Sequence, residues 1–159
     1  MRRNDRPIDL IIPRLYVGNV DAARNRALLK HYHITHIVDA AAELPCYFPR
    51  DFHYLELKLM DQPVGESLKN AVLKAYNFIS HALANGGVVL VHCAAGISRS
   101  TSTVIFYLMN KFMIPYEQAL RICRKGRPIT NPNMGYEAQL ETFSRNLFSQ
   151  TKPTHRQVR

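Results

Sequence analysis

The chain has 159 residues, of which 47% are hydrophobic and 21% are charged, and its formal net charge is +9. This length and composition are typical of one globular domain with a single core, and no apolar run reaches the ~18 residues that a membrane helix needs. The positive charge favours acidic partners, but no basic run with interleaved aromatic residues is present, so we expect neither nucleic-acid binding nor a membrane span.

The cysteines indicate free thiols. Cys46, Cys93 and Cys123 form an odd set without Cys-x-x-Cys spacing, which argues against a disulfide framework or a zinc site. We therefore predict no metal and no cofactor. The N-terminus has neither a signal peptide nor a lipidation motif, so we expect a cytoplasmic or nuclear protein, or both.

The first half of the chain is predicted to form four strands and one helix. Apolar runs and alternation place the strands at 8–12, 15–17, 34–38 and 53–59. Small and apolar residues at helical spacing place a single helix over about 21–32. Residues 44–51 contain two prolines and are predicted to form a loop. The strand at 53–59 ends just before Asp61.

The second half is predicted to be mainly helical around one buried strand. The run Val88-Val89-Leu90-Val91 is typical of a strand that is covered on both faces of a parallel sheet. Helices are predicted over 66–85, 100–112, 116–125 and 135–148. We thus predict an α/β fold with a central, mainly parallel, twisted sheet flanked by helices. One domain is expected over 1–150, followed by a basic, disordered tail over 151–159.

The segment from His92 to Ser100 lies between the buried strand and the next predicted helix. A short loop that closes onto a helix N-terminus directs backbone N–H groups inward, which favours binding of a tetrahedral anion. Gly96 permits the tight curl. Cys93 would have a lowered pKa beside a helix N-terminus and an arginine, and Arg99 can offer two parallel N–H groups to phosphate oxygens. The alternative is that Cys93 is an inert, buried cysteine.

This loop resembles the His-Cys-x5-Arg-Ser signature of cysteine-dependent protein tyrosine phosphatases, in particular the small, atypical dual-specificity branch. The resemblance implies a single catalytic domain that removes phosphate from phosphotyrosine and phosphoserine or phosphothreonine in proteins, through a phosphocysteine intermediate. It also implies that His92 orients the loop and that Ser100 assists departure of the thiolate. The phosphate would be bound by Ala94, Ala95, Gly96, Ile97, Ser98 and Arg99.

The reaction also needs a carboxylic acid that protonates the leaving oxygen. Asp61 follows a strand end, and its loop resembles the general-acid loop of dual-specificity phosphatases. The alternative is an aspartate that caps a turn before Gln62-Pro63. The lesser candidates are Asp39, Glu43, Asp51 and Glu66. Asn133 lies in a segment similar to the family's Arg-Pro…Pro-Asn-x-Gly pattern, which implies that it braces the phosphate loop.

Three other functions stay open at this point. A phosphoinositide phosphatase typically has further cationic residues in the loop, and Ala94, Ala95, Ile97 and Ser98 supply none. A non-catalytic phosphopeptide-binding module would use the same loop without a nucleophile. A basic adaptor would depend on net charge alone. The sequence does not indicate the physiological substrate, the oligomeric state or a redox role for Cys46 or Cys123.

Overall fold

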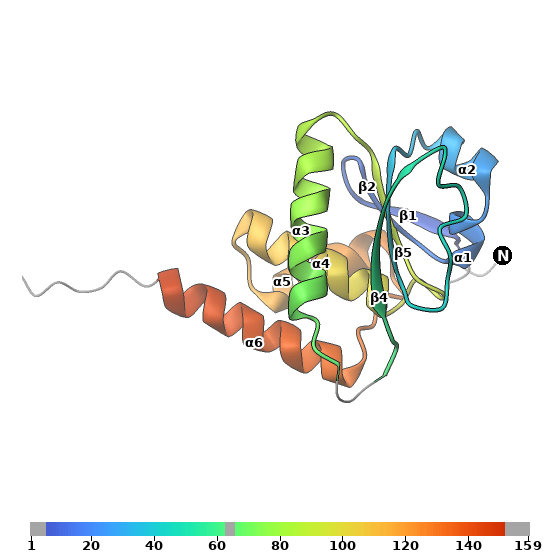
Figure 1. Ribbon diagram of the computed structural model, residues 1–159. Coiled ribbons are helices and arrows are strands. Elements are labelled where there is room, and N and C mark those ends of the chain that lie inside the picture. The colour runs from blue at the N-terminus through green and yellow to red at the C-terminus, as the bar shows by residue number, and fades with distance from the viewer. Residues whose placement is uncertain (1–5, 63–65, 152–159) are drawn as a thin grey trace, which may run out of the picture.

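Five strands form one sheet in the computed structural model, which describes residues 6–62 and 66–151 (Figure 1). They are β1 (Ile8–Ile12), β2 (Leu15–Gly18), β3 (His36–Ala41), β4 (His53–Leu59) and β5 (Val89–His92). Their order is β1-β2-β5-β3-β4, in which β1 runs antiparallel to β2 and all other neighbours run parallel. The prediction of an α/β fold with a mainly parallel sheet is confirmed.

Six helices in the described part of the chain cover the two faces of this sheet. They are α1 (Val20–Ala23), α2 (Arg26–His31), α3 (Lys69–Ala84), α4 (Arg99–Phe112), α5 (Tyr116–Gly126) and α6 (Met134–Thr151). Figure 1 shows α1 and α2 on one side of the strands and α3 to α6 on the other. Two separate hydrophobic clusters correspond to these two layers, and the larger one includes residues of α3, α4, α5 and α6.

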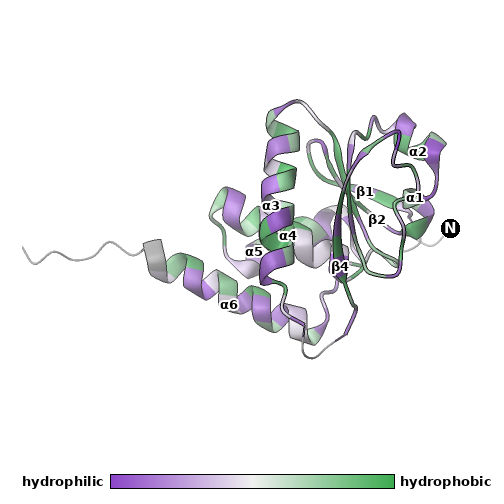
Figure 2. Cartoon of the chain, in the orientation of Figure 1, coloured by the Kyte–Doolittle hydropathy of each residue, from purple (hydrophilic) through white to green (hydrophobic). Residues whose placement is uncertain are grey.

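The burial of the central strand β5 explains why Val89, Leu90 and Val91 are all apolar. All four of its residues are buried. Val89 and Val91 belong to the larger cluster, whereas Leu90 belongs to the cluster beside α1 and α2. Alternate side chains of a strand point to opposite faces, so a strand covered on both sides needs apolar residues on both. Figure 2 shows mainly hydrophobic colour along β1 and β2, in contrast to the alternating colours of α3 and α6.

Several element predictions were wrong in detail. The strand predicted over 34–38 is β3 at His36–Ala41. The single helix predicted over 21–32 is two short helices, because Asn25 has an extended backbone and its side chain accepts a hydrogen bond from the Leu28 amide at 3.0 Å, which starts α2. Helix α3 begins at Lys69 and not at Glu66, because Glu66 binds the loop after β4 and the Leu68 amide donates to Gln139. Of the predicted tail, Thr151 ends α6, and 152–159 lie outside the described residues.

Candidate active site

The predicted site residues meet at the carboxyl ends of the central strands. Cys93 directly follows β5, which lies between β2 and β3. Ligands of open parallel sheets bind at this edge, where connections diverge to opposite faces. The loop 93–98 then leads into α4, so its anion-binding hollow is placed by a buried strand on one side and a buried helix on the other.

Every carbonyl oxygen from residue 94 to residue 98 is held by a donor outside the loop. The Val20 amide donates to Ala94 at 3.0 Å, and the Ser102 amide donates to Ser98 at 2.8 Å. The Asn131 amide donates to Ile97 at 2.9 Å. The remaining two carbonyl oxygens, those of Ala95 and Gly96, accept hydrogen bonds from the Arg127 guanidinium at 3.4 and 2.7 Å.

The N–H groups of the same five residues have no acceptor in the part of the chain that the structure describes. Backbone donors in a folded protein are normally paired, so five consecutive free amides beside the N-terminus of α4 form a site for an external acceptor. The helix dipole adds partial positive charge at this point. The loop therefore has the electrostatics of an oxyanion site without using any lysine.

Arg127 binds this loop from the end of α5, and this role was not predicted from the sequence. It is 1% exposed, and its Nη1 donates to Asp9 Oδ2 at 2.7 Å, so its charge is neutralised on the side away from the loop. Arg127 also explains why residue 96 is glycine. The φ of Gly96 is +66°, and an added Cβ would lie 2.6 Å from Arg127 Nη2. The Arg-Pro pattern that contains Arg127 was noted in the sequence. No local signal indicated that the Arg127 side chain binds the cysteine loop and Asp9.

The Cys93 thiol is 2% exposed, and its Sγ lies 3.1 Å from the Oγ of Ser100. Ser100 is in the first turn of α4 and fully buried, so a hydroxyl is available to donate to the sulfur whenever the sulfur carries charge. The two residues that the sequence paired as nucleophile and assisting hydroxyl are therefore in contact.

Arg99 uses three of its five N–H groups within the protein. Nη1 and Nη2 each donate to the Glu43 carboxylate at 2.6 Å, and Nη1 also donates to the Leu59 carbonyl oxygen at 3.1 Å. The Nε–H and the second Nη2–H have no acceptor among residues 6–62 and 66–151, and these two are parallel on one edge of the planar group. The guanidinium can thus bind two phosphate oxygens without releasing Glu43, whose own pKa is lowered by this hydrogen-bonded pair.

Asp61 is exposed and is held by Asn133, the residue before α6. The Asn133 side chain donates to Asp61 Oδ1 at 3.0 Å and accepts from the Tyr136 amide at 2.9 Å, while the Asn133 amide donates to Ser98 Oγ at 2.9 Å. Asn133 therefore contacts both the acid loop and the cysteine loop. Its role as loop support stays a prediction, and its side chain is directed to the acid.

The segment before Asp61 is fixed by two further residues. Glu66 Oε2 accepts from the Met60 amide at 2.9 Å and lies 2.7 Å from the Tyr136 hydroxyl, which also contacts the Met60 carbonyl oxygen. Burial raises the pKa of Tyr136, so it stays a neutral donor. A hollow of about 380 Å³ lies beside this segment and is lined by Ala42, Glu43, Met60, Asp61, Gln62 and Arg99.

Comparison with known proteins identifies this arrangement. The family model described as dual specificity phosphatase, catalytic domain, matches residues 15–146. The chain belongs to this family. Dual specificity protein phosphatase 1 of Arabidopsis thaliana is 37% identical over 145 residues, which cover 91% of this chain and 73% of that protein. The phosphatase assignment made from the cysteine loop is confirmed.

Other relatives show that this phosphatase domain also occurs in longer proteins. A probable rhodanese domain-containing dual specificity protein phosphatase of Dictyostelium discoideum is 36% identical over 141 residues, which cover 89% of this chain but only 29% of that protein. The crystal structure of a mouse putative dual specificity phosphatase complexed with zinc tungstate has a TM-score of 0.84 at 28% identity, covering 91% of this chain and 90% of that one. Membership of the family implies phosphorylated proteins as substrates.

Beneath the loop of this phosphatase lies a buried acid and base. His92 Nε2 is 3.9 Å from Asp39 Oδ1, and both side chains are 1% exposed. Burial lowers the pKa of His92 to about 4 and raises the pKa of Asp39 to about 7, because each charged form loses its hydration. The predicted role of His92 in orienting the loop stays a prediction.

The remaining candidates lie away from the cysteine loop. Asp51 pairs with Arg26 through two hydrogen bonds of 3.0 Å. Burial raises the pKa of Cys123 to about 11 and that of Cys46 to about 12, so neither is a ready thiolate. Among the described residues, no group of potential ligands could hold a metal ion, and no helix is long and apolar enough to cross a membrane.

Proposed function

We propose that this phosphatase hydrolyses phosphotyrosine and phosphoserine or phosphothreonine in proteins through a phosphocysteine intermediate on Cys93. The observation that carries the proposal is the loop in which five carbonyl oxygens are bound from outside and five amides are free, directly after the cysteine. Such a loop stabilises a dianionic phosphoryl group and the charge that develops on its equatorial oxygens during transfer.

In the first step, the Cys93 thiolate attacks phosphorus, and the bond between phosphorus and the substrate oxygen breaks. The carboxyl group of Asp61 gives its proton to that oxygen, so a neutral hydroxyl leaves. Asn133 holds the carboxyl group in place through the hydrogen bond to Oδ1. The free edge of the Arg99 guanidinium binds two phosphoryl oxygens throughout.

In the second step, water attacks the phosphocysteine, and Asp61, now a carboxylate, takes a proton from that water. The sulfur–phosphorus bond breaks, inorganic phosphate is released, and the thiolate is regenerated. The Ser100 hydroxyl stabilises the departing sulfur, since it lies 3.1 Å from Sγ. The thiol must stay reduced for this cycle, which supports a cytoplasmic or nuclear location.

The residues around the loop favour a single phosphoryl group over a polyphosphorylated lipid. The side chains of Ala94, Ala95, Ile97 and Ser98 carry no charge, so the loop lacks cations for further phosphates. The hollow beside Arg99 is also lined by Glu43 and Asp61, whose carboxylates disfavour a second phosphate nearby. A phosphoinositide would therefore be a poor substrate compared with a phosphopeptide.

The decisive experiment compares Cys93→Ser and Asp61→Asn with the unaltered protein. We expect Cys93→Ser to bind a phosphotyrosine peptide but release no phosphate. We expect Asp61→Asn to lower kcat by about 100-fold on phosphopeptides and much less on an aryl phosphate with an acidic phenol, which leaves without a proton donor. Substantial phosphate release by Cys93→Ser would rule out the covalent pathway. Peptide binding without turnover by the unaltered protein would instead favour a binding module.

A further inference from the structure

Asp39 and His92 form a buried pair that the proposed mechanism does not use. They are partners in the register of the adjacent parallel strands β3 and β5, and His92 directly precedes Cys93. Asp39 Oδ1 accepts from the Ala41 amide at 3.0 Å, but Oδ2 and both ring nitrogens of His92 have no hydrogen-bond partner among the described residues. The nearest nitrogen and oxygen of this acid and base are 3.9 Å apart, beyond hydrogen-bond distance, and both side chains are buried. A small movement of either side chain would therefore let the pair share a proton.

The surroundings of the pair contain charges of both signs. Asp39 faces Glu56 from β4, Glu43 from the turn after β3, and Arg99 from α4. His92 faces Arg99 and the backbone of Cys93. The remaining titratable groups close enough to Asp39 to respond to its charge are Cys46 and Tyr54. Because Arg99 is already paired with Glu43, it does not neutralise Asp39, and loss of hydration decides which form of the carboxyl group is favoured.

We propose that Asp39 is a positioning residue of the phosphatase reaction, which shares a proton with His92 and so holds the first residue of the cysteine loop. This inference rests on the proposed function of the loop. In the proposed state the 3.9 Å separation shortens, the carboxyl O–H donates to Nε2 of the neutral imidazole, and the ring is thereby fixed next to the backbone of Cys93. His92 is fully buried, so no water competes for this contact.

The pair also sets the charge beneath the loop. With the shared proton present it has no net charge, and loss of that proton to solvent leaves one buried negative charge beside Cys93. This charge opposes both the thiolate and a bound dianion, with little screening by water. Burial raises the pKa of Asp39 to about 7, so the charge develops as the pH rises through neutrality. Affinity for oxyanions should then fall above neutral pH because the buried Asp39 becomes charged.

The test measures sulfate binding by calorimetry at about pH 6 and about pH 8, because this ion is a dianion at both pH values and the enzyme cannot hydrolyse it. The substitution Asp39→Asn keeps the shape of the side chain and one donor for His92 but cannot ionise. The parent protein and the variant both carry Cys93→Ser, so that thiol titration does not contribute. We expect the dissociation constant of the parent to rise by about tenfold more between the two pH values than that of the Asp39→Asn variant.

A matched control is Asp51→Asn in the same background, since Asp51 is a surface carboxylate paired with Arg26. It should keep the pH dependence of the parent, and loss of that dependence would attribute the effect to net charge and overturn the inference. Equal pH dependence in the parent and the Asp39→Asn variant would overturn it as well, while leaving the phosphatase mechanism intact. Failure of every protein to bind sulfate would instead count against the oxyanion site and remove both proposals.

A measurement on the unaltered protein covers the case in which Asp39→Asn does not fold. The ring nitrogens of His92 can be followed by nitrogen-15 NMR from about pH 5 to about pH 9. We expect the nitrogen chemical shifts of His92 to change near neutrality because Asp39 ionises, while the ring itself stays uncharged. Constant His92 nitrogen shifts over this pH range would contradict proton sharing with Asp39. Shifts that report protonation of the ring near neutrality would contradict it as well.

Discussion

Arg99 illustrates how one side chain serves the fold and the substrate at once. Its contacts to Glu43 and Leu59 fix the guanidinium, and the edge formed by Nε and Nη2 is left for two phosphoryl oxygens. Free arginine side chains lose about 2 kcal/mol of rotamer freedom when they are ordered. Glu43 supplies this ordering before the substrate arrives, so the affinity for phosphate does not have to compensate for it.

The substitution Glu43→Gln tests whether Glu43 orders the Arg99 guanidinium for phosphate binding. It keeps one hydrogen bond but removes the charge that holds the guanidinium, so we expect kcat/KM for a phosphotyrosine peptide to fall by about tenfold, mainly through KM. Steady-state kinetics give the result. The control is Glu56→Gln on β4, where the carboxylate contacts Cys46 and not Arg99. If Glu43→Gln and Glu56→Gln are equally active, Glu43 has no positioning role.

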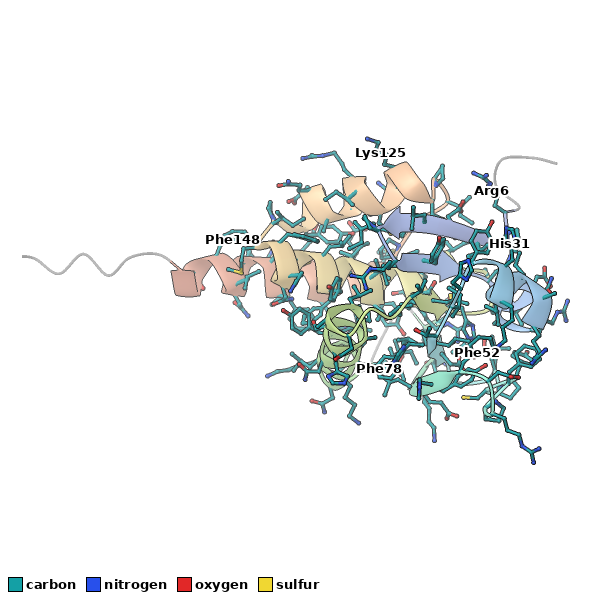
Figure 3. The ribbon with its side chains drawn as sticks, turned by 90° about the horizontal axis from the view of Figure 1, so that it is seen from above. Arg6, His31, Phe52, Phe78, Lys125 and Phe148 are labelled. Carbon is teal, nitrogen blue, oxygen red and sulfur yellow. The ribbon has the colours of Figure 1, made fainter. Side chains whose placement is uncertain are left out.

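At the level of elements, Arg127 connects three parts of the chain that are distant in sequence. From the end of α5 it reaches the carbonyl oxygens of the cysteine loop, Asp9 in β1 and the Arg6 carbonyl oxygen. Figure 3 shows that Lys125, only two residues earlier, extends outward from the same helix. The helix end thus presents one cation to solvent and buries another between the loop and the edge strand.

We expect Arg127→Met to lower the free energy of unfolding by about 3–5 kcal/mol, because it leaves the Asp9 carboxylate buried and unpaired. Urea unfolding provides the measurement, with Lys125→Met as the matched surface control. The double variant Arg127→Met/Asp9→Asn should recover part of this stability but not the affinity for tungstate, since the two loop carbonyl oxygens stay unpaired. Full recovery of tungstate affinity in the double variant would show that Arg127 acts only through Asp9.

The parts of this molecule that follow from short stretches of chain could be predicted, and those that depend on distant pairs could not. The strand β4 and the order of strand, cysteine and helix follow from local patterns. The split between α1 and α2 was also locally encoded, because Asn25 is a good N-cap, but the apolar stripe outweighed it. The pairing of Arg99 with Glu43 spans 56 positions, and that of Arg127 with Gly96 spans 31, so no periodicity could indicate them.

The charge of the whole molecule is a separate property from the charge of its active site. The net charge is +9, yet among the described residues Arg99 and Arg127, the two arginines that border the loop, are each paired with a carboxylate. Attraction of acidic substrates at long range must therefore come from the other basic residues. Such attraction acts on the encounter with the substrate and is weakened by salt, whereas the hydrogen bonds of the loop are shielded from it.

This distinction predicts how salt affects turnover. For a phosphopeptide with acidic flanking residues, we expect kcat/KM to fall by about tenfold between roughly 20 and roughly 200 mM salt, with little change in kcat, because screening lowers the rate of encounter and not the chemical step. The same phosphopeptide with neutral flanking residues should lose much less, since its phosphate alone is attracted. The comparison requires one enzyme, two peptides and a continuous phosphate-release assay. Equal salt dependence for both peptides would mean that the positive surface does not guide substrates to the loop.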